Sequence, residues 1–272
     1  MAESTVTNVL SIDVEDWYHG LETDPGTWDE YEDRVIDATR TILKILAAGK
    51  TRATFFVLGD VARKHPQLVK EIHEAGHEVG SHGPDHQFVY NKTPEQFETE
   101  MAADLELLEA ITGQKVQSYR APYFSITKES LWALPILKKL GIKYDSSIFP
   151  ISNYRYGIPT APRKPWITDE GLVEVPVATY PLGPKNFPCG GGFYFRFFTY
   201  RVLRHFYYSL NNHGEQFCFY LHPWEVDPDH PLLDCARGMK MRHYWALHKT
   251  TARLTKMIHD FDFGPLKEVI KL

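Results

Sequence analysis

The chain has 272 residues, of which 43% are hydrophobic and 24% charged, a composition typical of a globular protein with a sizeable core. Its formal net charge is −5, and its lysines and arginines are scattered, which argues against binding to nucleic acid or to an anionic membrane surface. No apolar stretch approaches the ~20 residues of a membrane-spanning helix. The N-terminal segment lacks the basic start and apolar core of a signal peptide. These features predict a cytoplasmic protein.

The first half of the chain alternates short apolar runs with helical periodicities. Strands are predicted at residues 9–12, 53–58, 77–83, 116–120 and 144–145. Helices are predicted at residues 35–46, 66–75, 93–113 and 127–141. Strands and helices that alternate in this way indicate a parallel sheet covered by helices, with its functional site at the carboxyl ends of the strands.

The pattern changes between residues 150 and 192, where prolines are frequent and a run of glycines follows. We expect a loop-rich insertion there, because long loops in compact enzymes usually serve function. A helix at 198–212 and a strand at 217–221 come next, and a last helix at 243–261 opens a helical extension over residues 243–272. Without internal repeats or a clear boundary, the sequence predicts one domain over residues 1–272.

Ionisable side chains follow five of the predicted strands directly. They are Asp13, Glu15 and Asp16 after the first strand, His82 and His86 after the third, Arg120 after the fourth, Asp145 in the fifth and His222 after the last. Because the carboxyl ends of parallel strands meet at one edge of a sheet, we expect these groups to converge on a single site.

The segments SHGPDH and SIDVED carry the side chains that suit a metal. His82 and His86 are four residues apart, and the intervening glycine and proline indicate a tight turn rather than a helix. Two imidazoles and one carboxylate leave coordination positions open, as in catalytic zinc sites. Three carboxylates within four residues repel one another unless a cation or an arginine compensates them. The alternative for this acidic segment is an ordinary solvated turn.

The ordered set SIDVED, SHGPDH, RAPY, YDSS and LHPW resembles the polysaccharide deacetylases, the NodB-homology family of carbohydrate esterases (family four). The resemblance is to the branch associated with exopolysaccharide loci, whose first motif reads D-V-E-D and which carries a stretch like CGGGFYFR. It spans about residues 9–224. It implies an α/β fold, an irregular and incomplete (β/α) barrel of about seven strands. It also implies a divalent metal, zinc in the first place and nickel or cobalt as alternatives.

The resemblance implies a role for each matching residue. Asp13 corresponds to the general base that takes a proton from the attacking water, and Arg120 to the arginine that holds this base. Tyr123 corresponds to the residue whose backbone N–H stabilises the oxyanion. His222 corresponds to the general acid that protonates the leaving amine, and Asp145 to the acid that tunes it.

His82 and His86 correspond to the two histidine ligands of the metal. The first motif departs from the family pattern, because a valine and not a second aspartate follows Asp13. The carboxylate ligand is therefore Glu15 or Asp16. Alternation along a strand favours Glu15, which lies on the same face as Asp13.

The implied reaction is removal of N-acetyl, or alternatively O-acetyl, groups from a sugar unit of a polysaccharide or its precursor, with Leu221 and Trp224 lining the acetyl pocket. Two other functions stay open. An allantoinase-like amidohydrolase acting on a small cyclic amide can lack the metal, whereas both histidine ligands are present here. A non-catalytic carbohydrate-binding relative has no need of Asp13 and His222, and both are intact.

Overall fold

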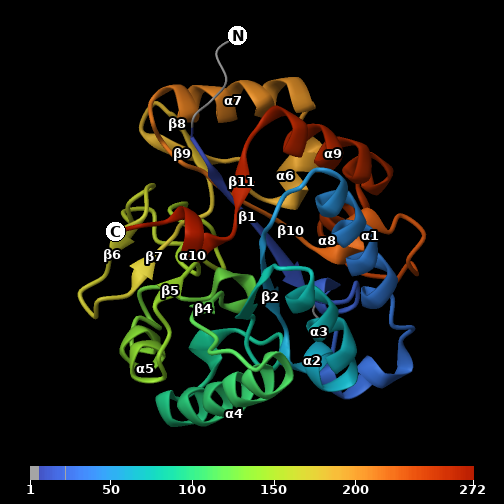
Figure 1. The fold of residues 1–272 in the computed structure, drawn as a ribbon, viewed down its shortest axis with the longest axis vertical. Helices are drawn as coiled ribbons and strands as arrows, with labels where there is room; N and C mark the ends of the chain where they lie inside the picture. Colours follow the sequence, from blue (N-terminus) through green and yellow to red (C-terminus); the bar gives the residue numbers. More distant parts are fainter. Residues whose placement is uncertain (1–5, 22) are drawn as a thin grey trace.

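The computed structural model describes residues 6–21 and 23–272, and within them nine strands form one curled, largely parallel sheet (Figure 1). The order is β10-β1-β2-β3-β4-β5-β7-β6, and β11 also pairs with β1. The strands are β1 (Asn8–Val14), β2 (Thr54–Val57), β3 (Glu78–Ser81), β4 (Ser118–Tyr119), β5 (Tyr144–Asp145), β6 (Trp166–Ile167), β7 (Val173–Glu174), β10 (Cys218–Leu221) and β11 (Phe263–Gly264). The predicted α/β fold with an incomplete barrel is confirmed, with more strands than the seven expected.

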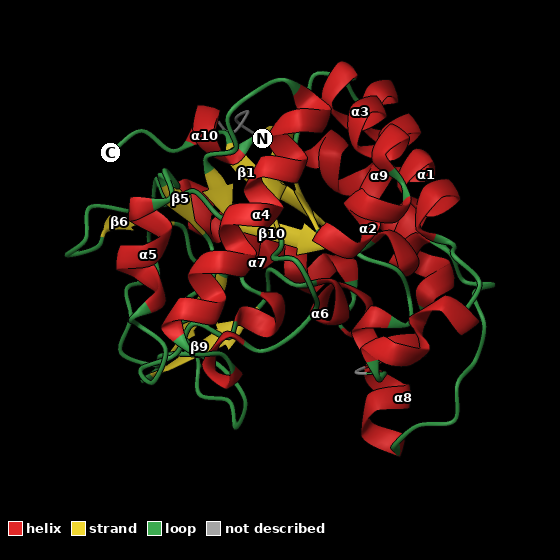
Figure 2. Cartoon of the chain, turned by 90° about the horizontal axis from the view of Figure 1, so that it is seen from below, coloured by secondary structure: helices red, strands yellow, loops and turns green. Residues whose placement is uncertain are grey.

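Helices surround the sheet (Figure 2). They are α1 (Val35–Ala48), α2 (Gly59–Lys64), α3 (Pro66–Glu74), α4 (Pro94–Thr112), α5 (Ala133–Lys139), α6 (Gly192–Phe197), α7 (Tyr200–Asn212), α8 (Arg237–Tyr244), α9 (Thr250–Asp260) and α10 (Leu266–Val269). Local sequence explains how α4 begins, because Thr93 and Gln96 form a capping box ahead of the first turn. None of the helices in the described ranges combines the length and apolar character that crossing a bilayer requires.

Strand β1 places its side chains alternately in two environments. Leu10, Ile12 and Val14 belong to the main hydrophobic core, between the sheet and the outer helices. Ser11 and Asp13 point the other way, where both meet the guanidinium of a buried arginine. This period of two is the ordinary geometry of a strand. It delivers the polar residues of the first motif to the inside of the curled sheet.

The structure corrects three of the predicted segments. Residues 150–192 are not only loop, since they contain β6, β7 and a hairpin of β8 (Thr179–Leu182) and β9 (Lys185–Pro188). The predicted helix at 127–141 begins only at Ala133. The predicted helix at 243–261 is interrupted, because Ala246 adopts a left-handed conformation (φ 54°), so that α8 ends before it and α9 starts after it. The C-terminal extension also supplies β11, which pairs with β1.

Two buried carboxyl groups lie opposite each other on β5 and β7, where Asp145 pairs in register with Glu174. Glu174 accepts a hydrogen bond from the backbone N–H of Ile148 at 2.8 Å, and Asp145 accepts one from the hydroxyl of Ser147. Burial and the adjacent Asp145 raise the pKa of Glu174 well above its ordinary value. Burial likewise raises the pKa of Asp145 to about 6. The pair therefore shares a proton that the unfolded chain would release at lower pH.

Glu174→Gln is expected to make the protein more stable at alkaline pH. A carboxyl whose pKa is raised by folding contributes stability below its unfolded pKa and loses it as the pH rises through the folded pKa. The free energy of unfolding of the wild type should thus fall as the pH rises above about 4, the ordinary pKa of a carboxyl group, by ~1.4 kcal/mol per pH unit for each carboxyl that stays protonated only in the folded state. Urea denaturation should show that the free energy of unfolding depends less steeply on pH in the variant than in the wild type. The exposed control Glu129→Gln should show the same pH dependence as the wild type. If the free energy of unfolding depended on pH equally in the wild type and in Glu174→Gln, the shared proton would be contradicted.

Candidate active site

Glu15, His82 and His86 form a cluster at the carboxyl ends of β1 and β3. One ligand atom from each lies within 4.8 Å of the others, and all three side chains are buried. His86 is brought back toward His82 by a turn at Gly83, whose φ of +81° suits glycine. The Nδ1 atom of His82 lies 2.8 Å from the backbone carbonyl oxygen of Arg120, a contact that fixes the ring and leaves Nε2 for the cluster.

The donor set fits a divalent cation. Oε2 of Glu15 lies 2.5 Å from Nε2 of His86, yet it accepts no well-aligned hydrogen bond from any described residue. Burial raises the pKa of Glu15, but His86 and His222 outweigh it and hold this pKa well below its ordinary value. Burial lowers the pKa of His82 to about 4, which keeps its imidazole neutral. An ionised carboxylate and a neutral imidazole are the forms that bind metal.

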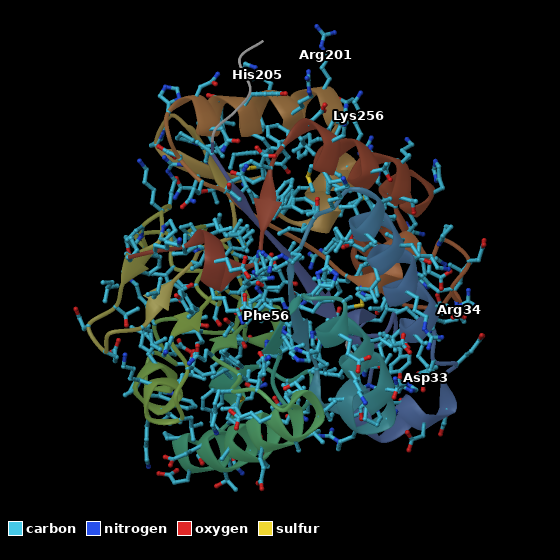
Figure 3. The ribbon with its side chains drawn as sticks, viewed as in Figure 1. Asp33, Arg34, Phe56, Arg201, His205 and Lys256 are labelled. Carbon is cyan, nitrogen blue, oxygen red and sulfur yellow. The ribbon has the colours of Figure 1, made fainter. Side chains whose placement is uncertain are left out.

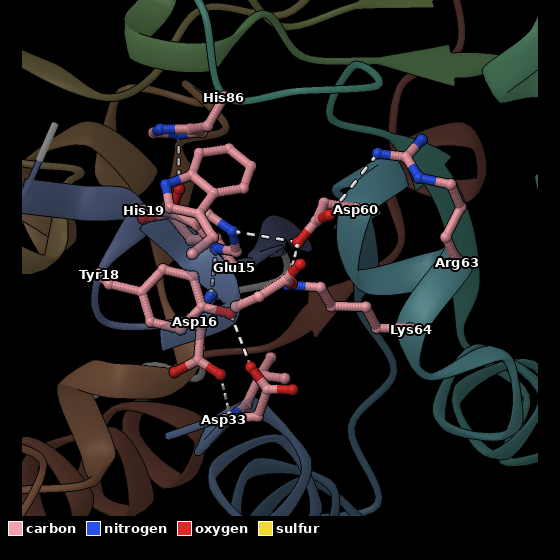
Figure 4. A network of polar contacts seen from close by, with 12 residues as sticks. Glu15, Asp16, Tyr18, His19, Asp33, Asp60, Arg63, Lys64 and His86 are labelled. Atoms are coloured by element: carbon pink, nitrogen blue, oxygen red, sulfur yellow. Dashed lines mark hydrogen bonds and ion pairs between the residues drawn. The ribbon is translucent and has the colours of Figure 1, made fainter. Parts of the chain in front are cut away.

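Asp16, the alternative carboxylate ligand, is directed elsewhere (Figure 4). Its Oδ2 accepts the backbone N–H groups of Arg34 and Val35 at 2.8 and 2.9 Å, and its Oδ1 accepts that of Trp17 at 2.8 Å. It therefore satisfies backbone donors at the start of α1, which would otherwise be left without partners. Of the two residues left open by the sequence, the structure places Glu15 in the cluster and not Asp16.

Asp13 and Arg120 form a fully buried ion pair beside the cluster. One terminal nitrogen of Arg120 donates to Oδ1 of Asp13 at 2.7 Å and to the hydroxyl of Ser11 at 2.8 Å. Its other nitrogens donate to the hydroxyl and the carbonyl oxygen of Ser146. The guanidinium lies 4.4 Å from the ring centroid of Phe56, a residue at the middle of the sheet (Figure 3). Asp13 is thus held in one orientation, with its second oxygen directed to the site.

His222 is held by a carboxylate that the sequence analysis did not identify. Its Nδ1 lies 2.9 Å from Oε2 of Glu225, and Arg196 donates to the other oxygen of Glu225 at 2.8 Å. Burial lowers the pKa of His222, but Glu15 and Glu225 outweigh it and raise this pKa to about 9. The signals were present in the sequence, as a glutamate three residues after the histidine and an arginine in CGGGFYFR.

The glycine run of CGGGFYFR allows this arrangement. A Cβ atom on Gly192 would lie 1.9 Å from Oε2 of Glu225, a distance at which the carboxylate could not remain in place. A side chain on Gly191 would lie 2.9 Å from the ring of Tyr220. Both glycines are thus required by the close approach of α6 to the site.

Asp145 does not contact His222, which corrects the role expected from the resemblance. It lies on β5 with its carboxyl group against Glu174, and Glu225 occupies the position beside the histidine. Leu221 also departs from expectation, since it is fully buried in the main core and does not line the cavity. The preceding residue, Tyr220, faces the cavity instead, because neighbouring residues of β10 point to opposite sides of the sheet.

Trp224 and Tyr123 do line the cavity, as predicted. The indole N–H of Trp224 donates to Oε1 of Glu15 at 3.1 Å, and its ring stacks between those of His222 and His243. Tyr123 adopts a left-handed backbone conformation (φ 56°) and packs its ring 4.3 Å from that of His86. A left-handed tyrosine is strained, and such residues cluster at functional sites.

A single cavity joins these groups. The polar part of its lining consists of Asp13, Glu15, His82, His86, His222 and Glu225. The remainder is largely aromatic and basic, and includes Phe124, Arg155, Tyr156, Phe193, Tyr220 and Arg242. Four of the five distant segments that the sequence predicted to converge thus meet here, Arg120 through its contact with Asp13, whereas Asp145 and Asp16 are directed elsewhere.

Comparison with known proteins agrees with this geometry. Residues 27–144 match the model of the polysaccharide deacetylase family, and residues 146–271 match a domain of unknown function, DUF3473. A peptidoglycan-N-acetylglucosamine deacetylase of Bacillus cereus is 32% identical over 108 residues, which are 39% of this chain and 38% of that protein. The chain thus spans well under half the length of this relative.

Solved structures share the fold at low sequence identity. A Mycobacterium smegmatis protein provisionally described as a polysaccharide deacetylase superposes with a TM-score of 0.61 at 19% identity, over 99% of this chain and 91% of that one. An allantoinase superposes with a TM-score of 0.57 at 14% identity, over 97% of this chain and 88% of that one. Sequence match and fold agree: residues 27–144 are similar to the polysaccharide deacetylase family, residues 146–271 are similar to the DUF3473 domain, and the chain shares the fold of these solved structures.

Proposed function

We propose that this protein is a metal-dependent deacetylase that hydrolyses the N-acetyl group of a sugar unit in a polysaccharide or in its precursor. The observation that carries the proposal is the set of groups that line one cavity. The Glu15–His82–His86 cluster shares this cavity with Asp13, which Arg120 holds, and with His222, whose Nε2 lies 3.6 Å from Oε1 of Glu15. This arrangement provides a carboxylate base, a cation site and an imidazole acid within reach of one substrate group.

The metal held by Glu15, His82 and His86, zinc in the first place, would supply Lewis acidity that polarises the acetyl carbonyl and makes water more acidic. Asp13 takes the proton of the attacking water. Arg120 holds one oxygen of Asp13, so that the other is directed at the water. The backbone N–H of Tyr123 is our candidate donor to the developing oxyanion.

His222 donates a proton to the sugar nitrogen as the carbon–nitrogen bond breaks, and acetate leaves. Its Nδ1 is held by Glu225, so Nε2 is the atom available for this transfer. Glu225 in turn is fixed by the buried Arg196. This chain of contacts orients the imidazole and favours its protonated form.

The likeness to an allantoinase concerns the fold alone. The deacetylase proposed here needs a metal, whereas an allantoinase-like amidohydrolase can lack it. The proposal is tested by acetate release from N-acetylated and O-acetylated oligosaccharides, with and without chelator, beside ring opening of a cyclic ureide. Acetate release that a chelator abolishes is the expected result. Ring opening that is insensitive to chelator, without acetate release, would overturn the proposal in favour of the amidohydrolase.

The cluster is expected to bind one divalent ion per chain. His86→Ala should lower the bound zinc to less than a tenth of an equivalent and abolish acetate release, because two remaining ligands do not make a catalytic site. Metal analysis of purified protein, after loading and dialysis, measures this directly. His205→Ala on α7, an exposed histidine outside the cavity, is the matched control and should retain the ion. Equal zinc in both variants would exclude the cluster as the metal site.

Asp13→Asn should separate metal binding from turnover. The amide keeps the shape of the side chain but cannot accept the proton, so kcat should fall by about 10²–10⁴-fold. The metal content should remain one per chain, because Asp13 is not in the ligand cluster. Full activity in this variant would refute the assignment of the base.

Glu225→Gln should lower kcat by roughly 10-fold or more and leave KM nearly unchanged, because the substituted amide no longer stabilises a protonated His222. Thermal denaturation and metal content should be measured alongside, since Arg196 loses its buried counter-charge. Glu106→Gln on the exposed side of α4 is the control. If the variant is folded and kcat is unchanged, Glu225 has only a packing role.

A further inference from the structure

Helix α8 and the loop before it project from the body of the protein beyond α6 (Figure 2). Three large apolar side chains of this segment are exposed to solvent: Leu232 by 71%, Trp245 by 50% and Met241 by 49%. Isolated exposed apolar residues are common, but a tryptophan and two aliphatic side chains on one protruding segment are not accounted for by packing. They form, together with Arg237 and Lys240, what we call the α8 face.

The charge of helix α8 is opposite to that of the chain as a whole. The helix contains the basic side chains of Arg237, Lys240 and Arg242 and no acidic one, whereas the loop before it carries Asp227, Asp229 and Asp234 and the whole chain has a net charge of −5. All three basic side chains are exposed. Helical spacing places Arg237 and Met241 on one side of α8, opposite the buried His243, and Trp245 follows directly after the helix.

The segment is fixed to the active site. The fully buried guanidinium of Arg196 donates to the backbone carbonyl oxygens of Arg242, His243 and Trp245 at the end of α8. Met239 and Arg242 of the same helix line the cavity. The α8 face therefore lies beside the mouth of the cavity, and anything bound to it would approach the site directly.

We propose that the α8 face binds peripherally to a lipid bilayer that carries anionic headgroups. Basic side chains beside an anionic surface and a tryptophan at headgroup level are the pattern of proteins that lie in the membrane interface. The basic residues of the sequence as a whole are scattered and argued against such a surface, but these three lie close together on α8, next to exposed apolar side chains. The negative charge elsewhere acts over only about 8–10 Å at physiological ionic strength, so it does not cancel a projecting patch.

Binding is measured by co-sedimentation of the full chain with vesicles of phosphatidylcholine alone, or with a third of phosphatidylglycerol, at low and high salt. We expect the wild type to bind the anionic vesicles, and high salt to weaken this binding without abolishing it. Arg237→Gln with Lys240→Gln should weaken binding by about 25-fold, at roughly fivefold per basic side chain. Met241→Ser with Trp245→Ser should weaken binding also at high salt, where the apolar contribution remains.

The control is Arg201→Gln with Lys256→Gln, which removes the same charge from exposed positions on α7 and α9, outside the α8 face (Figure 3). This variant should bind vesicles as the wild type does. No sedimentation of the wild type with anionic vesicles would overturn the proposal, as would equal losses in the control and the α8 variants. Binding of an acidic polypeptide, but not of vesicles, would assign the face to a protein instead. None of these measurements depends on deacetylase activity, so they fail or succeed independently of the proposed reaction.

Discussion

The ion pair between Asp13 and Arg120 is the constraint on which the site depends. Two fully buried charges are costly unless each is paired and hydrogen-bonded. Arg120 meets that condition by donating to Asp13, to Ser11 and to both oxygens of Ser146. These contacts join the carboxyl ends of β1, β4 and β5. Loss of either charged partner would leave the other buried without compensation, so the pair is required by the fold as well as by the proposed chemistry.

The same arginine connects the base to the metal cluster through its backbone. The carbonyl oxygen of Arg120 holds Nδ1 of His82, while its side chain holds Asp13. The position of the candidate base relative to a candidate ligand is therefore set by one residue on a short segment that follows β4. Such rigid placement is what proton transfer requires, because small displacements of a base weaken catalysis steeply.

Features that depend on the local sequence pattern, such as the direction of side chains along a strand and the position of a helix, were predicted from the sequence. Alternation in β1 indicated that Asp13 and Glu15 share a direction, and the apolar periodicity of α1 and α4 located these helices. The sequence could not locate β6 or β11, two-residue strands that are defined by their pairing with β7, which is itself short, and with β1, which is distant in the sequence. The partner of His222 was also missed, because the resemblance indicated Asp145, although a glutamate follows the histidine by three residues and the structure places it there. Contacts between distant segments were predicted where motifs marked them and missed elsewhere.

The DUF3473 region completes the site rather than adding a separate unit. The polysaccharide deacetylase match ends at residue 144, yet His222, Glu225 and Arg196 all lie beyond it, and β10 pairs with β1 at one end of the strand order. Arg196 binds Glu225 with one nitrogen and the end of α8 with the others. A displacement of α8 would therefore be transmitted through a single buried guanidinium to the carboxylate that orients His222. The end of α8 and the carboxylate beside His222 thus share one side chain, because the guanidinium of Arg196 binds both.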